Sequence, residues 1–249
     1  MMAAISVFLI TRNEAERLPQ TLAALRWADE IVVVDSGSTD RTVEIAREAG
    51  AATYHRHWDG YGPQKAYAEG LCRYDWLLNV DADEVVTPAL AEEIIRAAQG
   101  EPGAFRVRIL NVYPGDNAPR PFANDYNVVR FYHRSVGRYR DHPLFDRVDT
   151  DVPARSLTAP IHHFPLISLH HFVEKENAYS SFAAKAAKTR RRWPLLLRLP
   201  AEMPFAFLKF YILRRHITGG WKGFMFALTA AFARTLRIAK MLEGQTTKK

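Results

Sequence analysis

Four short apolar runs alternate with helical patterns over the first hundred residues, and this alternation restricts the fold more than any other feature. The runs are ISVFLI at residues 5–10, EIVVV at 30–34, ATYH at 52–55 and WLLNV at 76–80. Between them, the residue patterns predict helices over 14–27, 41–49 and 62–71, and a further helix begins at Thr87–Pro88. This order predicts an α/β fold with a mostly parallel sheet and helices on both faces.

Three of the predicted strands end in polar side chains. The segments that follow them are TRNE at 11–14, DSGS at 35–38 and DAD at 81–83. Ligands bind at the carboxyl ends of the strands in open α/β sheets, so these segments mark the expected site. The chain contains neither a G-x-G-x-x-G motif after the first strand nor a G-x-x-x-x-G-K-[ST] motif, which argues against a dinucleotide enzyme and a P-loop NTPase.

The acids at the strand ends suggest how a nucleotide is held. Asp35 has the chemistry to accept hydrogen bonds from a base or ribose, and Asp81 with Asp83 to hold a hard divalent cation at a diphosphate. Aspartate is also common at turns and helix N-termini, which is the simpler reading for Asp40. Asp81, Asp83 and Glu84 would repel one another without a cation, which favours a functional reading.

The C-terminal part is strongly basic. Residues 185–249 hold fifteen Lys and Arg against two acids, a net charge of +13 within a chain of +7, so residues 1–184 carry −6. The intervening residues are aliphatic and Phe-rich, which favours interfacial helices at an anionic membrane over nucleic acid. No stretch is long and apolar enough for a membrane span, and packing of these helices on the body is the alternative. The start of the chain argues against a secretory signal peptide, and the single cysteine, Cys72, against a disulfide framework.

Three motifs carry a specific resemblance. ISVFLITRNEAERL, IVVVDSGSTDRTVEIA and DWLLNVDADE resemble the inverting family 2 glycosyltransferases with the GT-A fold, and more narrowly the WaaE/KdtX-type lipopolysaccharide-core glucosyltransferases. The similarity resumes at PLFDRV and IHHFPLISLHHFVEKENAYSSFAAKAA. It implies a donor-binding half at 1–103 and an acceptor-binding half at 104–184, and the basic composition adds an amphipathic membrane-associating tail at 185–249.

The resemblance also implies roles for individual residues. The donor is a nucleotide-activated sugar, most often UDP-linked, and Mn²⁺ or Mg²⁺ neutralises its diphosphate. Thr11, Arg12, Asn13, Glu14, Asp35, Ser36, Gln64, Lys65 and Asp81 are expected to contact the nucleotide sugar. The metal ligands are Asp83 and Asp81, with His162 or His163 as a further ligand. A zinc site built from the four histidines His162, His163, His170 and His171 is disfavoured.

An inverting transferase needs a general base for the acceptor hydroxyl. By resemblance the base is Asp146, in the segment Phe145-Asp146-Arg147-Val148, where Phe145 stands in place of the usual histidine. Asp141 and Glu84 are the alternatives. Arg190, Arg191, Arg192 and Trp193 are expected to meet phosphates of a lipid acceptor or of membrane headgroups.

The expected enzyme transfers one hexose, with glucose the first choice, to a glycolipid such as the lipopolysaccharide inner core, at the cytoplasmic face of the inner membrane. A polyprenyl-phosphate or polyprenyl-diphosphate sugar acceptor is the enzymatic alternative, and a nucleotide- or nucleic-acid-binding module is the non-enzymatic one. Nucleic acid is not an expected partner of the enzyme. The apolar helices leave a homo-oligomer open.

Overall fold

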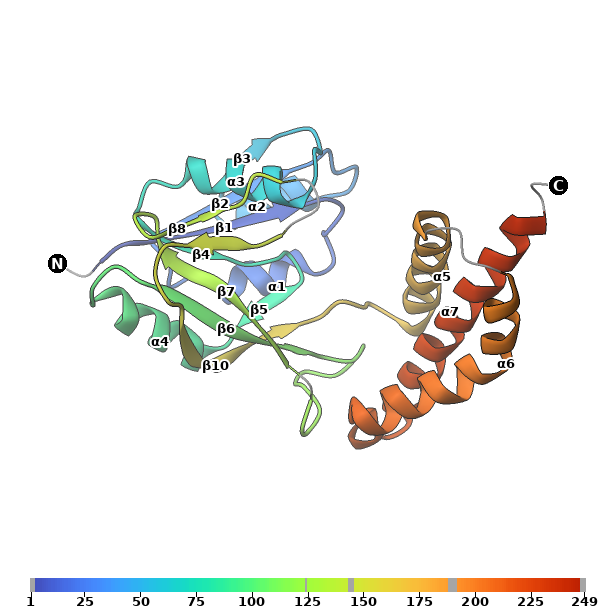
Figure 1. Ribbon diagram of the computed structural model, residues 1–249. Coiled ribbons are helices and arrows are strands. Elements are labelled where there is room, and N and C mark those ends of the chain that lie inside the picture. The colour runs from blue at the N-terminus through green and yellow to red at the C-terminus, as the bar shows by residue number, and fades with distance from the viewer. Residues whose placement is uncertain (1–2, 124, 143–145, 188–191, 247–249) are drawn as a thin grey trace. The chain divides into compact units, whose positions relative to one another are not determined.

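The computed structural model describes residues 3–123, 125–142, 146–187 and 192–246 (Figure 1). The chain divides into two compact units. The sheet unit comprises residues 1–110 and 125–164, and the helical unit comprises residues 111–124 and 165–249.

The sheet unit contains one eight-stranded sheet in the order β3-β2-β1-β4-β7-β6-β10-β5. Its strands are β1 (Ile5–Thr11), β2 (Glu30–Asp35), β3 (Ala52–His55), β4 (Trp76–Asn79), β5 (Glu84–Val86), β6 (Ala104–Asn111), β7 (Asp125–His133) and β10 (Arg155–His163). A separate antiparallel pair is formed by β8 (Gly137–Tyr139) and β9 (Val148–Thr150). The first four strands pair in parallel, as their helical crossovers require, whereas β4–β7, β6–β7 and β5–β10 are antiparallel.

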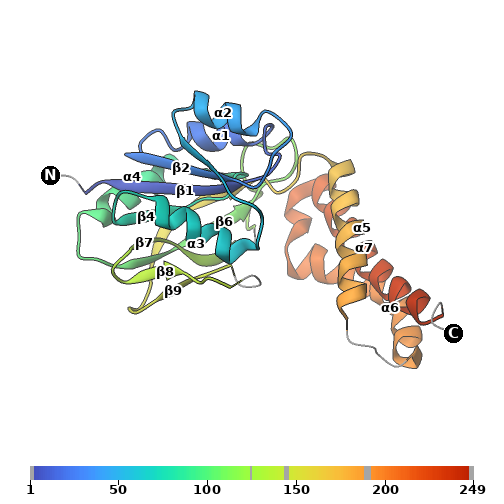
Figure 2. The same cartoon turned by 90° about the horizontal axis from the view of Figure 1, so that it is seen from above.

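Two apolar layers sandwich the sheet because successive side chains of a strand point to opposite faces. On one face, Val7 and Leu9 of β1 share a core with α1 (Leu18–Ala23), α2 (Thr42–Glu48) and α4 (Pro88–Ala98). On the other, Phe8 packs with α3 (Tyr61–Leu71) and with the β8–β9 pair. Figure 2 shows α1 and α2 on the opposite side of the sheet from α3. The predicted α/β architecture is confirmed, with its parallel part confined to the first four strands.

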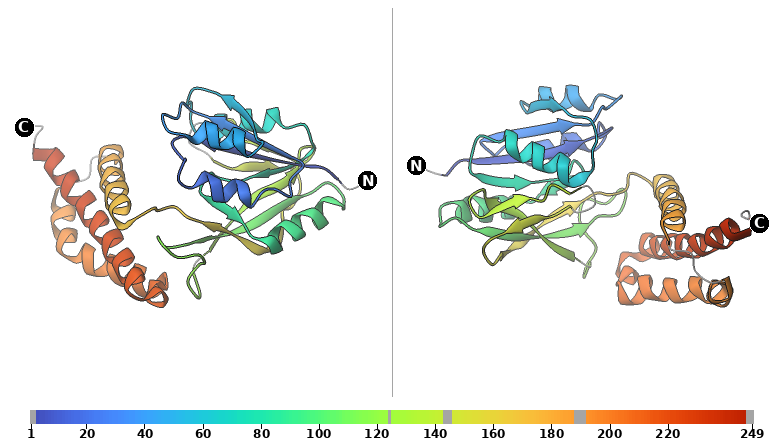
Figure 3. Two further views of the ribbon diagram at one scale, coloured as in Figure 1. Left: turned by 180° about the vertical axis from the view of Figure 1, so that it is seen from behind. Right: turned by 45° about the horizontal axis from the view of Figure 1, so that its top comes forward.

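The helical unit is built from α5 (Leu169–Ala186), α6 (Arg192–Leu208), a π-helical turn (Lys209–Leu213), a 3-10 turn (His216–Gly219) and α7 (Gly220–Thr246). Figure 3 shows α5 and α6 running beside α7. Phe226 of α7 stacks on Phe172 of α5 at 4.6 Å between ring centroids, and on His216 at 4.5 Å.

The unit boundaries differ from those expected from the sequence. Residues 165–184 belong with the C-terminal helices, and residues 111–124 join them from the middle of the chain. The physical reason is packing, since Nζ of Lys240 in α7 donates hydrogen bonds to Asn177, Ser180 and Ser181 of α5. The boundary expected at residue 185 was based on charge composition, which does not reveal such packing contacts.

Large apolar side chains remain exposed on α6. Trp193, Leu197, Phe205 and Leu208 are each more than half exposed. Their spacings of four, eight and three residues are each close to a whole number of helical turns, which places them along one side of the helix. In the helices that the structure describes, none combines the length and the low polarity that crossing a membrane requires.

Candidate active site

A tight turn after β2 encloses the first candidate residue. The buried Asp35 carboxylate accepts backbone N–H bonds from Gly37 and Ser38, both at 2.8 Å, and hydroxyl bonds from Ser38 and Thr11. Gly37 has φ +94°, a conformation that glycine adopts without strain. Asp35 therefore organises this turn, and Thr11 at the end of β1 is its paired neighbour in the sheet.

The loop after β1 is tied to the loop after β2. The Asn13 side-chain oxygen accepts a hydrogen bond from the backbone amide of Thr39 at 2.8 Å. The backbone amide of Asn13 donates to the Ser38 hydroxyl. The Glu14 amide donates to Thr42 at 2.7 Å. Arg12 is exposed beside them. The carboxyl ends of the two strands thus form one polar rim, where the sequence placed the nucleoside.

The segment Asp81-Ala82-Asp83 forms a turn between β4 and β5. The Glu84 amide donates to the Asp81 carbonyl at 3.0 Å, and the Glu84 carboxylate accepts from the Asp81 amide at 2.9 Å. Thr21 of α1 donates its hydroxyl to the Ala82 carbonyl. The turn is therefore fixed from both sides, and its two aspartates have defined partners.

Lys65 of α3 connects Asp81 with Asp146. Its Nζ atom lies 2.8 Å from Oδ1 of Asp81 and 3.0 Å from Oδ2 of Asp146, although the side chain is only 1% exposed. Burial opposes the charge, but Asp81 holds the pKa of Lys65 above its usual range. A cationic lysine is thereby held between two carboxylates from distant parts of the chain.

Arg130 of β7 is a second buried cation at the same place. Its guanidinium lies 2.7 Å from Asp81 and 3.1 Å from Glu84, and it also donates to Asn79 at the end of β4. Burial alone would raise the pKa of Asp81, but Arg130 and then Lys65 hold it well below its usual range. Asp81 is therefore a carboxylate that two buried cations neutralise.

Asp83 has a different set of partners. Its Oδ2 atom lies 3.2 Å from Nη1 of Arg17 and 3.3 Å from Nε2 of His163. Arg17 also binds Glu14 through two nitrogens at 2.8 Å. Burial lowers the pKa of His163, but Asp83 reverses this effect and holds the pKa above its ordinary value.

The pairing of β5 with β10 explains why His163 reaches this point. His163 lies opposite Glu84 in the antiparallel register, and His162 lies opposite Val85. Neighbouring residues of a strand point to opposite faces, so one of the two histidines faces Asp83. The 3.3 Å contact with Asp83 identifies it as His163.

The donor chemistry of Asp83 and His163 fits a divalent cation. A carboxylate oxygen and an imidazole nitrogen 3.3 Å apart are able to bind one Mn²⁺ together. Among the residues that the structure describes, no cluster of three or more His, Cys, Asp or Glu side chains is placed to hold a metal.

The three candidates for the general base have different surroundings. Asp146 is partly exposed, with Oδ2 on Lys65. Asp141 is exposed, and Phe145, which precedes Asp146, lies outside the described residues. Glu84 is fully buried and bound to Arg130, and burial raises its pKa. Glu84 is thus closed off from solvent, whereas Asp146 and Asp141 are accessible.

Gln64 completes the rim from α3. Its buried amide nitrogen donates to the Ser36 hydroxyl at 3.0 Å and to the Arg56 carbonyl at 3.1 Å. Its Oε1 atom is buried without a hydrogen-bond partner among the described residues. The adjacent residues Gln64 and Lys65 therefore have different roles. Gln64 fixes the loop after β2, and Lys65 neutralises Asp81 in the turn after β4.

Of the four residues expected to meet lipid phosphates, Arg190 and Arg191 lie outside the described residues. Arg192 and Trp193 form the exposed start of α6.

Sequence reasoning did not select Arg17, Arg130 or Asn79. Arg17 belongs to the first motif, in the segment NEAER. It lies three residues after Glu14, a spacing that allows the two side chains to form a hydrogen bond. Arg130 interrupts the apolar run NVVRFYH, and a charged residue inside a buried strand needs a partner. The charged residue inside an apolar strand could therefore have indicated Arg130 as a candidate, although it does not show which acids Arg130 contacts.

Comparison with known proteins identifies the family of this chain. Residues 6–156 match the model of glycosyl transferase family 2, and the chain belongs to this family of glycosyltransferases. An uncharacterized glycosyltransferase of Rickettsia bellii is 36% identical over 96% of this chain and 86% of its own length. The lipopolysaccharide core biosynthesis glycosyltransferase LpsC of Rhizobium meliloti is 28% identical over 98% of this chain and 94% of its own. The expected family and its GT-A type of α/β fold are confirmed.

Solved structures give more distant similarities. The glucosyl-3-phosphoglycerate synthase of Mycobacterium tuberculosis, in complex with Mn²⁺, UDP and phosphoglyceric acid, matches with a TM-score of 0.38 and 20% identity over 53% of this chain and 56% of its own. The chain spans 41%, 42% and 56% of the first three solved chains that it matches.

Proposed function

We propose that this glycosyltransferase moves a single hexose, with inversion, from a UDP-sugar to a membrane-held glycolipid such as a lipopolysaccharide inner core. The observation that carries the proposal is the convergence of Asp81, Asp83 and Asp146 around Lys65 and His163 at the carboxyl ends of the strands. Family membership supports glycosyl transfer and decides against the non-enzymatic alternative. The similarity to LpsC over nearly the whole of both chains supports the acceptor class.

The donor fits the polar rim around Asp35 and Gln64. Thr11, Arg12, Asn13, Glu14 and Ser36 belong to the same rim, and we assign the nucleoside to it. The internal bonds of Asp35 fix the loop geometry, so that backbone and hydroxyl groups of this loop are available in one arrangement. The diphosphate follows toward Lys65, whose charge is favourable for phosphate.

Asp83 and His163 would hold Mn²⁺ or Mg²⁺ when the donor binds. Mg²⁺ is commonly bound through one or two carboxylates together with substrate phosphates, so a small set of protein ligands is sufficient. The ion supplies charge neutralisation for the departing diphosphate. In the same proposal Asp81, already bound to Lys65 and Arg130, orients these cations rather than donating its own oxygens to the ion.

Asp146 is the proposed general base. Its carboxylate takes the proton of the acceptor hydroxyl while that oxygen forms a bond to C1 of the sugar. The bond between C1 and the diphosphate oxygen breaks, and its electron pair leaves with UDP. Lys65 contacts both Asp146 and Asp81, so it orients the base and places a positive charge near the leaving phosphate. Attack opposite the leaving group converts an α-linked donor into a β-linked product.

A thermal-shift panel tests the donor class. UDP, UDP-glucose, UDP-galactose, UDP-GlcNAc, GDP-mannose and NAD are each measured with Mn²⁺ and with EDTA. A ligand that binds only the folded protein raises Tm by mass action. We expect a Mn²⁺-dependent rise with UDP and with one UDP-sugar. A rise with GDP-mannose alone, or with none of the ligands, would contradict the proposed donor.

The acceptor class needs a separate assay with the donor found in the panel. Inner-core lipopolysaccharide and undecaprenyl phosphate are offered in parallel detergent solutions, and the radiolabelled lipid product is isolated. We expect transfer to the lipopolysaccharide. Transfer to undecaprenyl phosphate instead would support the polyprenyl alternative and refute the glycolipid acceptor.

The helical unit supports peripheral binding at the cytoplasmic face of the inner membrane. Trp193 and Leu197 are 73% and 72% exposed, next to Arg192 and Arg198. Aromatic and aliphatic side chains beside cations bind the interface of anionic bilayers. We expect Trp193→Glu with Leu197→Glu to abolish sedimentation with phosphatidylglycerol vesicles. The matched control is Tyr54→Glu, at an exposed aromatic residue of the sheet unit, and an equal loss in this control would refute the assignment of the face.

A further inference from the structure

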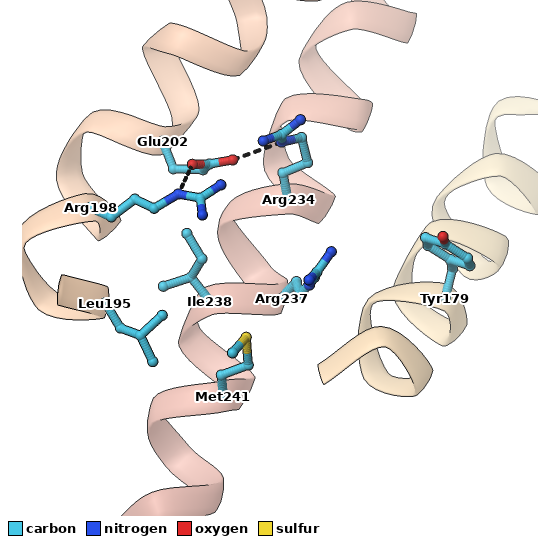
Figure 4. Close-up of a pocket in the computed structure, with 8 residues that line it drawn as sticks. All are labelled: Tyr179, Leu195, Arg198, Glu202, Arg234, Arg237, Ile238 and Met241. Atoms are coloured by element: carbon cyan, nitrogen blue, oxygen red, sulfur yellow. Dashed lines mark hydrogen bonds and ion pairs between the residues drawn. The ribbon is translucent and has the colours of Figure 1, made fainter. Parts of the chain in front are cut away.

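The helical unit contains a cavity of about 260 Å³, lined by both charged and apolar side chains, that the transferase site does not use. It is lined by residues of all three long helices: Tyr179 of α5, Leu195, Arg198 and Glu202 of α6, and Arg234, Arg237, Ile238 and Met241 of α7 (Figure 4). The helical spacing explains the lining, since residues three to four apart share a face. The cavity is smaller than the roughly 300–1,000 Å³ of pockets that enclose whole drug-sized ligands. Its size therefore suits one chemical group rather than a complete nucleotide sugar.

A buried carboxylate organises two of the arginines. Glu202 is 3% exposed, and its oxygens accept hydrogen bonds from Nε of Arg198 at 2.6 Å and from Nε of Arg234 at 2.7 Å. Figure 4 shows the carboxylate between the two guanidinium groups. Although burial opposes it, the two arginines hold the pKa of Glu202 below its ordinary value, so the acid stays ionised.

This contact leaves most of the guanidinium donors unused. An arginine side chain has five N–H donors in a planar fork, and Glu202 takes only the Nε–H of each. The side chains of Arg198 and Arg234 are 45% and 34% exposed, so their terminal nitrogens are open to a ligand. The buried acid thus fixes two forks that retain donors for another anion.

Arg237 adds a cation without an internal acid. Among the residues that the structure describes, it has neither a hydrogen bond nor an ion pair, and it lines the same cavity. Three arginines and one glutamate give the cavity a net charge of +2. Arginine forks match phosphate oxygens in geometry and charge, which makes an anion of this shape the favoured ligand.

Apolar residues border the cations. Leu195, Ile238 and Met241 line the cavity, while Trp193 and Leu197 on the same stretch of α6 are exposed. A phosphate carried on a hydrocarbon chain satisfies both kinds of surface at once, whereas a fully polar anion satisfies only the arginines.

We propose that this cavity is a phosphate-binding site that takes the head group of a phospholipid or another phosphorylated amphiphile. The phosphate oxygens bind the terminal nitrogens of Arg198 and Arg234 and the guanidinium of Arg237, and the alkyl portion continues along the apolar residues of α6. The site is independent of the donor site and does not rest on the assignment of the transferase substrates.

The test measures binding to the full-length protein by isothermal titration at fixed ionic strength. The probes are inorganic phosphate and monomeric dihexanoyl phosphatidic acid, with chloride as the reference anion. We expect saturable binding of both, tighter for the phosphatidic acid. Arg237→Gln should weaken both by roughly tenfold, as expected when one charge-assisted contact is lost.

Two controls make the result decisive. Arg214→Gln removes the same charge from an exposed residue of the helical unit outside the cavity, and it should leave both affinities unchanged. Asp83→Asn, in the sheet unit, should also bind both probes as the parent does, which separates this site from the proposed transferase function. Circular dichroism confirms that Arg237→Gln is folded.

Three outcomes then remain. Tighter binding of phosphatidic acid, lost in Arg237→Gln only, supports the phospholipid as the source. Equal binding of both probes, lost in the same variant only, supports the phosphate site with a free phosphate as its ligand and overturns the lipid. Absence of saturable binding, or equal losses in Arg237→Gln and Arg214→Gln, overturns the site.

Discussion

The ammonium group of Lys65 lies 2.8 Å from the carboxylate of Asp81, and the lysine side chain is 1% exposed. The nearest acids of Lys65 come from the turn after β4 and from residue 146, so this one cation holds two parts of the sheet unit together. Replacement of Lys65 by a neutral residue removes one cation from the carboxylates of Asp81 and Asp146.

We predict that Lys65→Met destabilises the protein by about 3 kcal/mol, near the lower end for a broken buried pair, because Asp81 is 30% exposed and keeps Arg130. Urea denaturation followed by circular dichroism measures the loss. The double variant Lys65→Met with Asp81→Asn should recover part of it, since the unpaired charge is removed. Arg41→Ala, which breaks an exposed pair with Glu44, should stay within about 0.5 kcal/mol of the parent. If the loss of stability in the double variant equals the sum of the losses in the two single variants, the proposed coupling between Lys65 and Asp81 is contradicted.

The sequence predicted the local structure of the first hundred residues, including the strand ends that carry the candidate residues. The apolar runs at 5–10, 30–34 and 76–80 became β1, β2 and β4, and their polar ends meet at one edge. This success has a local cause, because strand and helix periodicities are written in neighbouring residues. The family motifs fall in the same region.

The rest depended on pairings between distant residues. His163 meets Asp83 because β10 lies antiparallel to β5, and Arg130 meets Asp81 because β7 lies beside β4. Neither register can be read from local periodicity. The burial of Glu84 has the same origin, since the opposing strand and Arg130 close it off. The transition from tail to body at residue 185 was placed by charge, whereas packing of α5 on α7 sets the boundary earlier.

The metal proposal predicts different effects for the two neighbouring histidines. His163 faces Asp83, whereas His162 occupies the other face of β10. We expect Asp83→Asn to abolish the Mn²⁺-dependent rise in Tm with UDP, and His163→Ala to weaken Mn²⁺ binding about tenfold or more. Titration of Mn²⁺ followed by electron paramagnetic resonance gives the affinities. His162→Ala is the matched control and should bind Mn²⁺ as the parent does; a loss in this variant comparable with that of His163→Ala would refute the assignment.

The proposed base predicts a separation of rate from binding. Asp146→Asn keeps a side chain of the same size beside Lys65 but removes the proton acceptor. We expect kcat to fall by about 10²–10⁴-fold, the range for loss of a general base, with the UDP-dependent rise in Tm retained. Asp141→Asn is the matched comparison and should keep kcat within severalfold of the parent. If kcat falls in Asp141→Asn and not in Asp146→Asn, the base is Asp141.

The helical unit contains a histidine whose titration should be measurable as stability. His216 is 8% exposed, its Nδ1 atom shares a hydrogen bond with the Tyr113 hydroxyl, and its ring stacks on Phe226. Burial, followed by the nearby charges of Arg120 and Arg214, lowers the pKa of His216 from 6.5 to about 4. The folded protein therefore holds this imidazole neutral in a range where the unfolded chain protonates it.

The sign follows from proton linkage. Between the unfolded pKa of 6.5 and the folded value of about 4, the unfolded chain binds more protons, so stability falls as pH falls through this window. The contribution of His216 is complete above the window and amounts to about 2 kcal/mol between pH 7.5 and pH 5. Urea denaturation at these two pH values gives the change for the parent. In His216→Gln the change should be smaller by that amount, although the variant is less stable at both pH values. His170→Gln, at a histidine with an 83% exposed side chain, should show the pH dependence of the parent. Equal pH dependence in His216→Gln and the parent would show that His216 does not remain neutral in the folded protein.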